Sequence, residues 1–437
     1  MTSDTGERML PLEGVRVLSQ AIVWAGPFGT MILSDLGADV IEVESIQHLN
    51  PTRAAVRHLP DLFMQSPTGA GYLNRDNSEG FWNRSATFNY AKRGHRSITL
   101  DLLRPEGLEL FYSLVREADV FLENNAADVV EDLKIDWPQL SAINPKLIMV
   151  RFPGFGISGP YRHFKGYGAT MEAIVGHTML RGYRDSDPSA TPPIYHGDPT
   201  AGATVAFAIQ SALYARERTG EGQLIELSQG EAIVHHLSYA LMDAFMNDRI
   251  HDHWGNRHPW MAPYGLFPCK GDDRWLALAV DSDAAFAALA GEMGRPELAT
   301  EPRFADVSSR YRNQDVLEPL IADWTRQHDD HELMDRLQAV GVMATMVAHQ
   351  PEMFHDPQLQ ERGYFIELDH PDTGPRRYPG PMAHFEVNPL TPVRGRAPRL
   401  GEHNREVLQD ILKLDDAQVQ HLLDEQVIGD VYLENAR

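Results

Sequence analysis

Two short apolar segments near the start of the chain flank a helix-like stretch, and their spacing restricts the fold more than any other feature. The first segment, Val15–Leu18, is followed by a turn at Ala25–Pro27, and the second covers Asp39–Val43. Between them, Phe28–Leu36 has helical character and stops at Gly37, a residue typical of helix ends. A strand, a helix and a strand within about thirty residues predict a βαβ unit with parallel strands and a right-handed crossover.

The same alternation continues along the chain. Strand-like runs occur at Ser97–Leu100, Val120–Leu122 and Leu147–Val150, and Pro105 begins a helix at a first-turn position that proline tolerates. Repeated alternation of strands and helices predicts an α/β fold whose main part is a large Rossmann-like, doubly wound domain.

Acidic residues outnumber basic residues, which limits the partners of the chain. The 437 residues include 62 Asp and Glu against 39 Lys and Arg, for a formal net charge of -23. Such a surface repels nucleic acid phosphates and anionic lipid headgroups, so we expect no nucleic acid and no membrane partner. An anionic ligand would need a local basic cluster.

The low cysteine content and the lack of long apolar segments are typical of a cytoplasmic protein. The single cysteine, Cys269, allows neither an intrachain disulfide nor a thiolate cage around a metal. The stretch from Met1 to Leu10 lacks the apolar core of a secretory signal, and no apolar run is long enough to cross a bilayer. We therefore expect a cytoplasmic protein.

Three common cofactor and metal motifs are absent from the sequence. Ala25–Gly29 has the wrong glycine spacing for a nicotinamide dinucleotide fingerprint, and Pro27 occupies the turn. Neither GxxxxGK[ST] nor HExxH occurs, and His251 and His253 are loop histidines of the kind that is usually solvated. We expect no metal and no permanently bound cofactor.

The densest basic run is Lys92–Arg96, immediately before a predicted strand. Cations and loop amides at such a place form a phosphate clamp in some proteins. The alternative is a solvated turn, which composition alone favours.

Gly197, Asp198 and Pro199 open a long helix predicted to end at Arg218. Asp is a preferred N-cap and Pro is preferred at the next position, so helix initiation alone explains the pair. The alternative is functional, because the amides and dipole of a helix N-terminus keep a carboxylate ionised. An ionised carboxylate can attack an activated acyl group.

The order of the motifs along the chain is more informative than any one of them. In this order the chain resembles the class III (family III) CoA-transferases, the group that contains formyl-CoA transferase and carnitine CoA-transferase. The segments that carry the resemblance are Pro11–Leu18, Ala25–Pro27, Leu36–Glu44, Asn89 with Lys92–Arg93, Arg96–Ser97, Leu100–Leu102, Ala118–Val120 with Glu123–Asn124, Asn144–Leu147, Gly154–Gly156 with Gly159–Tyr161, Gly197–Asp198 with Ala201–Gly202, and Arg216–Gln223.

The resemblance implies a nucleophile and a substrate. Asp198 stands where the family has its nucleophilic aspartate, so the implied reaction moves CoA between carboxylic acids through an aspartyl-CoA thioester. CoA or acyl-CoA is the substrate, and no other cofactor is needed. The implied CoA-binding residues are Trp24, Ala25, Arg93, Arg96, Leu100 and Asn124. The family pattern is not kept at Trp24, Ser45, Asn125 and Asp132, and Lys134 lies nearby as a substitute phosphate contact.

The resemblance also implies the domain organisation and the assembly. We expect a discontinuous large CoA-binding domain formed by residues 1–229 and 363–437. Residues 230–362 are expected to form a linker helix and a smaller α+β domain. The family fold is an interlocked homodimer, so we expect the same assembly here.

Two alternatives stay open at this point. The α-methylacyl-CoA racemases share the fold and use an Asp within a Gly-His-Asp motif, but the matching stretch is Gly166-Tyr167-Gly168, which has neither the acid nor the base that racemisation needs. A non-catalytic CoA-binding protein would keep the groove without needing Asp198. Glu172, His177 and His196 are given structural rather than catalytic roles. The acyl donor and the acceptor are not readable from the sequence.

Overall fold

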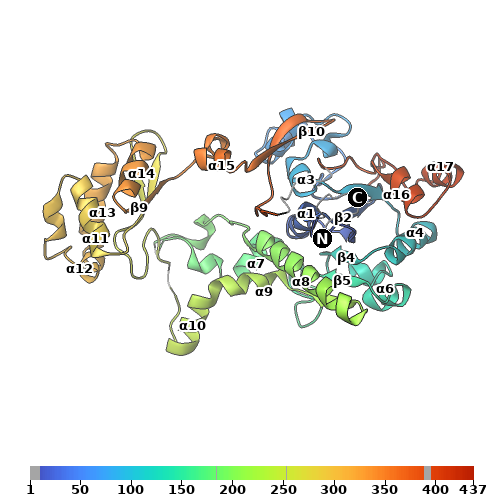
Figure 1. Ribbon diagram of the computed structural model, residues 1–437, viewed down its shortest axis with the longest axis horizontal. Helices are drawn as coiled ribbons and strands as arrows, with labels where there is room; N and C mark the ends of the chain where they lie inside the picture. The colour runs from blue at the N-terminus through green and yellow to red at the C-terminus, as the bar shows by residue number, and fades with distance from the viewer. Residues whose placement is uncertain (1–9, 184, 252, 388–394) are drawn as a thin grey trace. The chain divides into compact units, whose positions relative to one another are not determined.

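The chain divides into two compact units, each of which is described here by itself. The computed structural model describes residues 10–183, 185–251, 253–387 and 395–437. The first unit comprises Met1–His177, Pro193–Leu241 and Glu361–Arg437, and the second comprises Thr178–Pro192 and Met242–Gln360. Figure 1 shows the elements in chain order, coloured from blue to red.

A six-stranded sheet forms the centre of the first unit. Every strand pairs in parallel with its neighbours, in the order β3-β2-β1-β4-β5-β6. The strands are β1 (Arg16–Gln20), β2 (Asp39–Glu44), β3 (Arg96–Thr99), β4 (Val120–Glu123), β5 (Ile148–Arg151) and β6 (Gln223–Glu226). The chain therefore winds outward on one side from β1 and on the other side from β4, which confirms the predicted doubly wound fold.

Helices surround this sheet. They are α1 (Ala25–Asp35), α2 (Asp61–Met64), α3 (Ala86–Ala91), α4 (Pro105–Arg116), α5 (Val129–Asp132), α6 (Trp137–Ile143), α7 (Gly168–Ile174), α8 (Gly197–Thr219), α9 (Gln229–Val234), α16 (Asn404–Asp410) and α17 (Asp416–Asp424). Short 3-10 segments occur at Thr68–Gly71, Leu73–Arg75, Phe81–Arg84 and His235–Leu237. A two-stranded antiparallel ribbon, β10 (Phe365–His370) with β11 (Gly374–Pro379), completes the unit.

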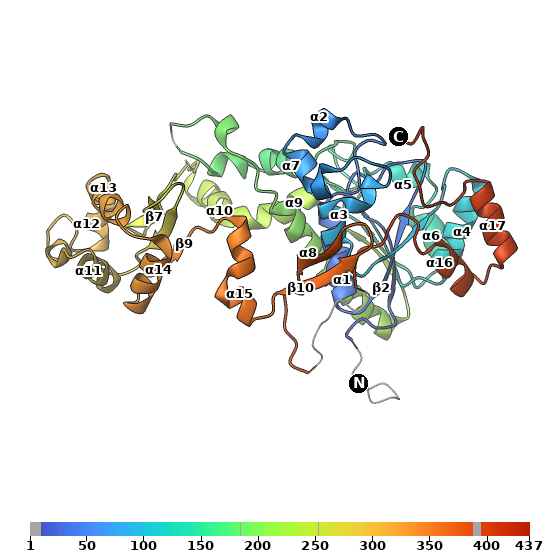
Figure 2. The same ribbon diagram turned by 90° about the horizontal axis from the view of Figure 1, so that it is seen from above.

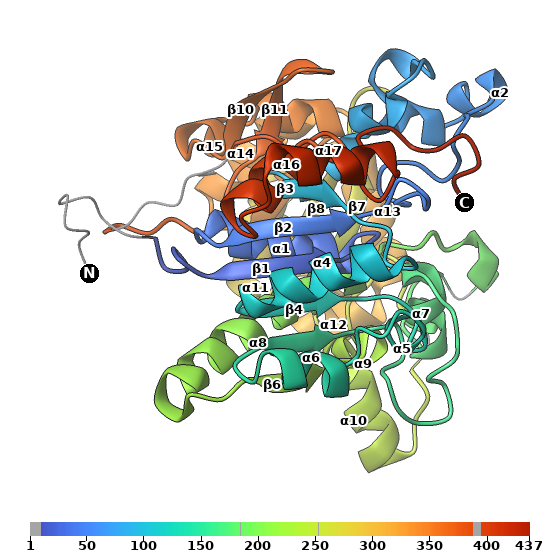
Figure 3. The ribbon, with the colours of Figure 1, turned by 90° about the vertical axis from the view of Figure 1, so that its right-hand side faces the viewer.

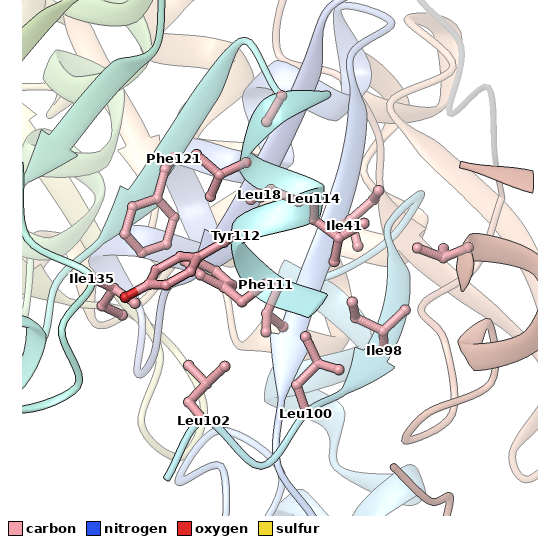
Figure 4. Packing of buried hydrophobic residues seen from close by; sticks show 14 of the residues in the cluster. Leu18, Ile41, Ile98, Leu100, Leu102, Phe111, Tyr112, Leu114, Phe121 and Ile135 are labelled. Carbon is pink, nitrogen blue, oxygen red and sulfur yellow. The ribbon is translucent and has the colours of Figure 1, made fainter. Parts of the chain in front are cut away.

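Alternate residues of the central strands pack on opposite faces of the sheet. Leu18, Ile41 and Phe121 belong to the cluster that packs with α4, α6, α16 and α17, which lie in front of the sheet in Figure 3. Figure 4 shows part of this cluster, with Phe111 of α4 among the strand residues. The alternating residues Val17 and Val40 pack instead with α1 and α8. Because both faces are covered, apolar residues on either face of the central strands are buried, as in other buried parallel sheets.

The second unit has its own core. Its sheet is antiparallel, in the order β7-β8-β9, with strands β7 (Tyr264–Pro268), β8 (Trp275–Ala279) and β9 (Met343–Met346). Its helices are α11 (Asp283–Glu292), α12 (Val307–Arg312), α13 (Gln314–Thr325) and α14 (Asp330–Ala339), and its 3-10 segments are Thr178–Leu180, Pro188–Ala190, Pro296–Ala299 and Gln350–His355. Buried residues of the sheet and the helices form one cluster, as expected for a smaller α+β domain.

Two helices cross the limits of the units, α10 (Ser238–Asn247) and α15 (Pro357–Glu361). The predicted linker helix corresponds to α9, a 3-10 turn and α10, so it is helical but interrupted at His235–Leu237. Among the described residues, no helix combines the length and the apolar character needed to span a membrane.

Candidate active site

The largest opening near the switch point of the sheet lies at the carboxyl ends of the strands. This cavity of about 460 Å³ is lined by the last residues of β1 and β2, Gln20 and Glu44, and by Leu100 and Asn125, which follow β3 and β4. In open α/β sheets, ligands bind in the crevice outside the carboxyl ends of the strands. We refer to it as the strand-end cavity.

A second cavity of about 270 Å³ holds Asp198. It is lined by the loop after β1, by Asn124 beyond β4, and by the segment that leads into α7. Ile22 and Asn125 line both cavities, so the two adjoin each other at these residues. We refer to the second as the Asp198 cavity.

Asp198 lies within the first turn of α8 rather than at its cap. The helix begins at Gly197, the N-cap residue is His196, and no capping side-chain hydrogen bond is formed there. The prediction that Asp198 is an ordinary N-cap followed by Pro at the first helical position is therefore wrong. The Asp198 side chain is nearly buried, with 6% exposed, and no hydrogen bond to its carboxylate is found among the described residues.

Burial controls the charge of this carboxylate. Desolvation, followed by the nearby Glu172 carboxylate, raises the pKa of Asp198 to about 6. The helix N-terminus favours the ionised form, but burial and a like charge favour the protonated form and outweigh it. At neutral pH the group is still mainly ionised, and it is more basic than an ordinary aspartate.

Close contact between α1 and α8 fixes the position of the first turn of α8. A Cβ built on Gly202 would lie 2.5 Å from the backbone oxygen of Ala25, and one built on Gly29 would lie 3.0 Å from the backbone oxygen of Gly202. Figure 2 shows the two helices side by side. The two glycines therefore let the helix backbones approach each other one turn after Asp198.

Several residues predicted to bind CoA lie around these cavities. Trp24 is the N-cap residue of α1 and contacts Tyr195 edge to face, with ring centroids 6.1 Å apart. Asn124 lines the Asp198 cavity and holds the loop after β1, because its Oδ1 accepts from the Ile22 N–H at 2.8 Å. Leu100 lines the strand-end cavity. Lys134 is exposed and follows Leu133, another residue of that cavity.

The basic run Lys92–Arg96 is not a solvated turn, so that interpretation is wrong. Lys92 is fully buried and pairs with Glu42 at 2.7 Å, while Arg93 and Arg96 form ion pairs with Asp35 and Asp39. These guanidinium groups neutralise buried carboxylates of α1 and β2, and neither residue lines the two cavities described above. These ion pairs give no support to the predicted contacts of Arg93 and Arg96 with the phosphates of CoA.

Three residues of the Asp198 cavity escaped the sequence prediction. Lys165 is an exposed cation, and no ion pair or hydrogen bond of its side chain occurs in the described part of the chain. Tyr167 is exposed as well, and Gly168 begins α7 directly against Asp198. The sequence signal for this segment is Gly166-Tyr167-Gly168. It indicates that the acid and the base of the racemase motif are absent, and it does not indicate a contact with Asp198.

A buried carboxylate lies next to the first turn of α8. Glu172 of α7 is fully buried, and its Oε1 lies 3.4 Å from Nδ1 of His196. One ligand atom each of Glu172, His177 and His196 falls within 4.8 Å of the others, a spacing that a metal ion can use. The direct contact between Glu172 and His196 already accounts for their approach, so we assign no metal to this group.

The chain was compared with known proteins. The model of the family described as CoA-transferase family III matches residues 12–404. A succinyl-CoA–D-citramalate CoA-transferase of Chloroflexus aurantiacus is 33% identical over 418 residues, covering 96% of this chain and 98% of that protein. A succinate–glutarate CoA-transferase of Agrobacterium fabrum is 33% identical over 412 residues, covering 94% and 98%. The crystal structure of a CAIB/BAIF family protein from Brucella suis superposes with a TM-score of 0.79 at 31% identity, covering 92% of this chain and all of that one.

Proposed function

The chain belongs to CoA-transferase family III, and from this premise we propose that it moves CoA from an acyl-CoA to a carboxylic acid through a thioester on Asp198. The relatives named above are CoA-transferases that act on carboxylic acids, which supports the same class of enzyme here. Racemisation is not proposed, because the relatives are not racemases and Gly168 stands where the racemase motif has its aspartate.

The proposed reaction begins at the Asp198 carboxylate. One carboxylate oxygen attacks the thioester carbonyl, the carbon–sulfur bond breaks, and CoA leaves as the thiolate. The thiolate then attacks the Asp198 carbonyl carbon of the resulting mixed anhydride. The donor acid leaves as a carboxylate and Asp198 carries CoA as a thioester. The acceptor carboxylate repeats the two steps in reverse, so that protons and electrons balance without a redox cofactor.

The adjoining cavities carry this proposal. The nucleotide end of CoA would occupy the strand-end cavity, and the pantetheine arm would pass Ile22 and Asn125 to bring its sulfur to Asp198. Lys134, beside the strand-end cavity, is an exposed cation that suits the phosphates of CoA, and Lys165, in the Asp198 cavity, is an exposed cation that suits the carboxylate of the acid. Both contacts are part of the proposal.

We also propose the acid class and a homodimer. Succinyl, citramalate and glutarate in the names of the relatives make short dicarboxylic acids the first donors and acceptors to test. On α8, Phe207 is 72% and Tyr214 is 60% exposed, and a spacing of seven residues places them on one face. Two exposed aromatic side chains on one helix face suit a protein interface. A monomeric mass in sedimentation at micromolar protein would contradict the dimer.

Intact-protein mass spectrometry tests the chemistry. The enzyme is incubated with succinyl-CoA, with and without hydroxylamine, and the matched control is Asp198→Asn, which keeps the size of the side chain. We expect a hydroxylamine-sensitive adduct with the mass of CoA on the peptide that contains Asp198, and none in the variant. Transfer activity that survives in Asp198→Asn would overturn the assignment of the nucleophile.

A further inference from the structure

The loop Ala21–Trp24, between β1 and α1, lies where the two cavities adjoin. Ile22 lines both cavities, and Val23 lines the Asp198 cavity. On the proposed path of CoA, the pantetheine arm passes this loop on its way from the strand-end cavity to Asp198. The backbone conformation of the loop therefore shapes the passage between the two cavities.

Side chains from other parts of the chain hold the backbone of this loop. The Ala21 N–H donates to Oγ of Ser19 at 3.2 Å, and the Ala21 carbonyl oxygen accepts from Nζ of Lys92 at 2.9 Å. The Asn124 carboxamide bonds both backbone groups of Ile22, because it accepts from the N–H at 2.8 Å and donates to the carbonyl oxygen at 3.0 Å. These side chains satisfy backbone groups that a sheet or a helix would otherwise pair, and so they determine the conformation.

Val23 has a backbone conformation that a β-branched residue rarely adopts. Its φ is 62°, in the left-handed region, where such a residue is strained. Thr52 holds it there, because the Thr52 Oγ1 accepts from the Val23 N–H at 2.9 Å and donates to the Val23 carbonyl oxygen at 3.3 Å. A strained residue keeps its conformation only where its surroundings impose it, and such residues cluster at binding and catalytic sites.

Thr52 is itself held on both sides. It is buried, its N–H donates to Oδ1 of Asn50 at 2.9 Å, and its carbonyl oxygen accepts from Oγ of Ser85 at 2.8 Å. Asn50 lines the strand-end cavity. The hydroxyl group that holds Val23 is therefore presented from a fixed backbone segment beside that cavity.

We propose that Thr52 is a positioning residue that holds Val23 in the left-handed conformation and so shapes the passage through which the pantetheine arm reaches Asp198. The inference rests on the proposed path of CoA across the two cavities. Without the hydroxyl group, Val23 relaxes to a negative φ and carries Ile22 with it, so the passage changes shape. The strand-end cavity keeps its lining, and the nucleotide end of CoA binds as before.

Calorimetric titration of two ligands tests the proposal. The ligands are CoA and adenosine 3′,5′-bisphosphate, which carries the adenosine and the 3′-phosphate of CoA but no pantetheine arm. Thr52→Val keeps the shape of the side chain and removes both hydrogen bonds to Val23, so it should weaken CoA binding about 10-fold and leave binding of the bisphosphate unchanged. The Val23 amide should also exchange with deuterium about 10-fold faster. Thr52→Ser, which keeps the hydroxyl group, should match the wild type in both measurements.

The matched control is Thr30→Val in α1. Thr30 is fully buried and its Oγ1 donates to the backbone oxygen of Pro27 at 3.1 Å, so this variant loses a hydrogen bond of the same kind outside the loop. We expect it to lose stability, as Thr52→Val does, and to bind both ligands as the wild type does. Weaker CoA binding confined to Thr52→Val therefore separates positioning of the loop from a general loss of stability.

The outcomes also separate this inference from the function on which it rests. If Thr52→Val weakened the binding of both ligands equally, or of neither, the hydroxyl group would have no role at the passage and the inference would be overturned. If the wild type bound CoA no more tightly than the bisphosphate, the proposed path of the arm would fail and the inference with it. A missing adduct on Asp198 would overturn the nucleophile alone, because the two binding measurements involve no chemical step.

Discussion

Gly168 touches Asp198: a Cβ on Gly168 would lie 3.0 Å from Oδ2 of Asp198 and 2.9 Å from a ring carbon of Tyr195. The first residue of α7 thus faces the proposed nucleophile with no side chain between them. The space in front of the carboxylate exists because this position is glycine.

Gly168→Ala should reduce adduct formation and turnover without unfolding the protein. The added methyl group would press on Oδ2 and on the Tyr195 ring and displace the carboxylate from the thioester. A displacement of this kind costs about 100-fold in rate. Transfer between succinyl-CoA and glutarate measures the effect, and unchanged CoA binding with an unchanged thermal midpoint would show that the fold is kept. Wild-type turnover in Gly168→Ala would contradict the contact.

The acid limb of the wild-type pH profile should reflect the pKa of Asp198, which burial raises to about 6. Only the ionised carboxylate attacks, so kcat/KM should be level above this value and fall as the pH drops through it. At pH 5 the activity should be about a tenth of the plateau. A limb near pH 4 would show that the group is solvated in the working enzyme.

Because the pKa of Asp198 is raised in the folded protein, its ionised carboxylate destabilises the folded state at neutral pH. A carboxyl group whose pKa is higher in the folded than in the unfolded state favours folding when protonated, and this contribution is lost as the pH rises toward 6. Asp198→Asn should therefore be more stable than the wild type at pH 8, by on the order of 2 kcal/mol. The difference should vanish near pH 4. Denaturant unfolding at the two pH values measures it, and an equal difference at both would contradict a charge effect.

Five of the six strands of the sheet could be predicted from sequence, because they contain local apolar runs that alternate with helical stretches, as Val15–Leu18 and Asp39–Val43 do for β1 and β2. The sixth, β6, was not predicted, because its residues are partly polar and none of them is fully buried. Asp198 was found by resemblance, and its first-turn position was missed because Asp is a preferred N-cap residue and Pro is preferred at the position after the cap.

Burial of the basic run could not be predicted from sequence. The partners of Arg93 and Arg96 lie 58 and 57 residues away in the chain, on α1 and β2, and only the tertiary fold brings them together. The Glu172 and His196 pair escaped for the same reason, since α7 and the start of α8 meet through packing. The composition of the run Lys92–Arg96 gives its charge, but it does not tell which carboxylates pair with it.

Gly202→Ala should destabilise the enzyme. The new methyl group would meet the backbone oxygen of Ala25 and the backbone nitrogen of Gly29, and backbone atoms cannot turn away, so α1 and α8 would have to separate. Overpacking of this kind costs about 1–3 kcal/mol. The matched control is Gly291→Ala in α11, where a Cβ meets nothing within 4 Å and a helical Ala should be neutral or slightly stabilising. Equal thermal midpoints of the two variants would contradict the close contact.

Arg93→Met should lower stability and leave CoA binding intact. Arg93 is almost fully buried and pairs with Asp35, so its loss leaves a buried carboxylate without its cation, at a cost of about 3–5 kcal/mol. Adding Asp35→Asn removes that uncompensated charge and should restore part of the lost stability. A double-mutant cycle of denaturant midpoints measures the coupling.

Lys134→Met gives the opposite pattern and distinguishes a structural from a binding cation. Lys134 is exposed beside the strand-end cavity, so its loss should leave the thermal midpoint unchanged while it weakens CoA binding several-fold. Calorimetric titration of CoA at two salt concentrations measures this, and the difference from the wild type should shrink at high salt because a charge–charge contact is screened. If Arg93→Met, measured below its unfolding midpoint, lost CoA affinity and Lys134→Met kept it, the phosphates of CoA would have to be assigned to the basic run and not to Lys134.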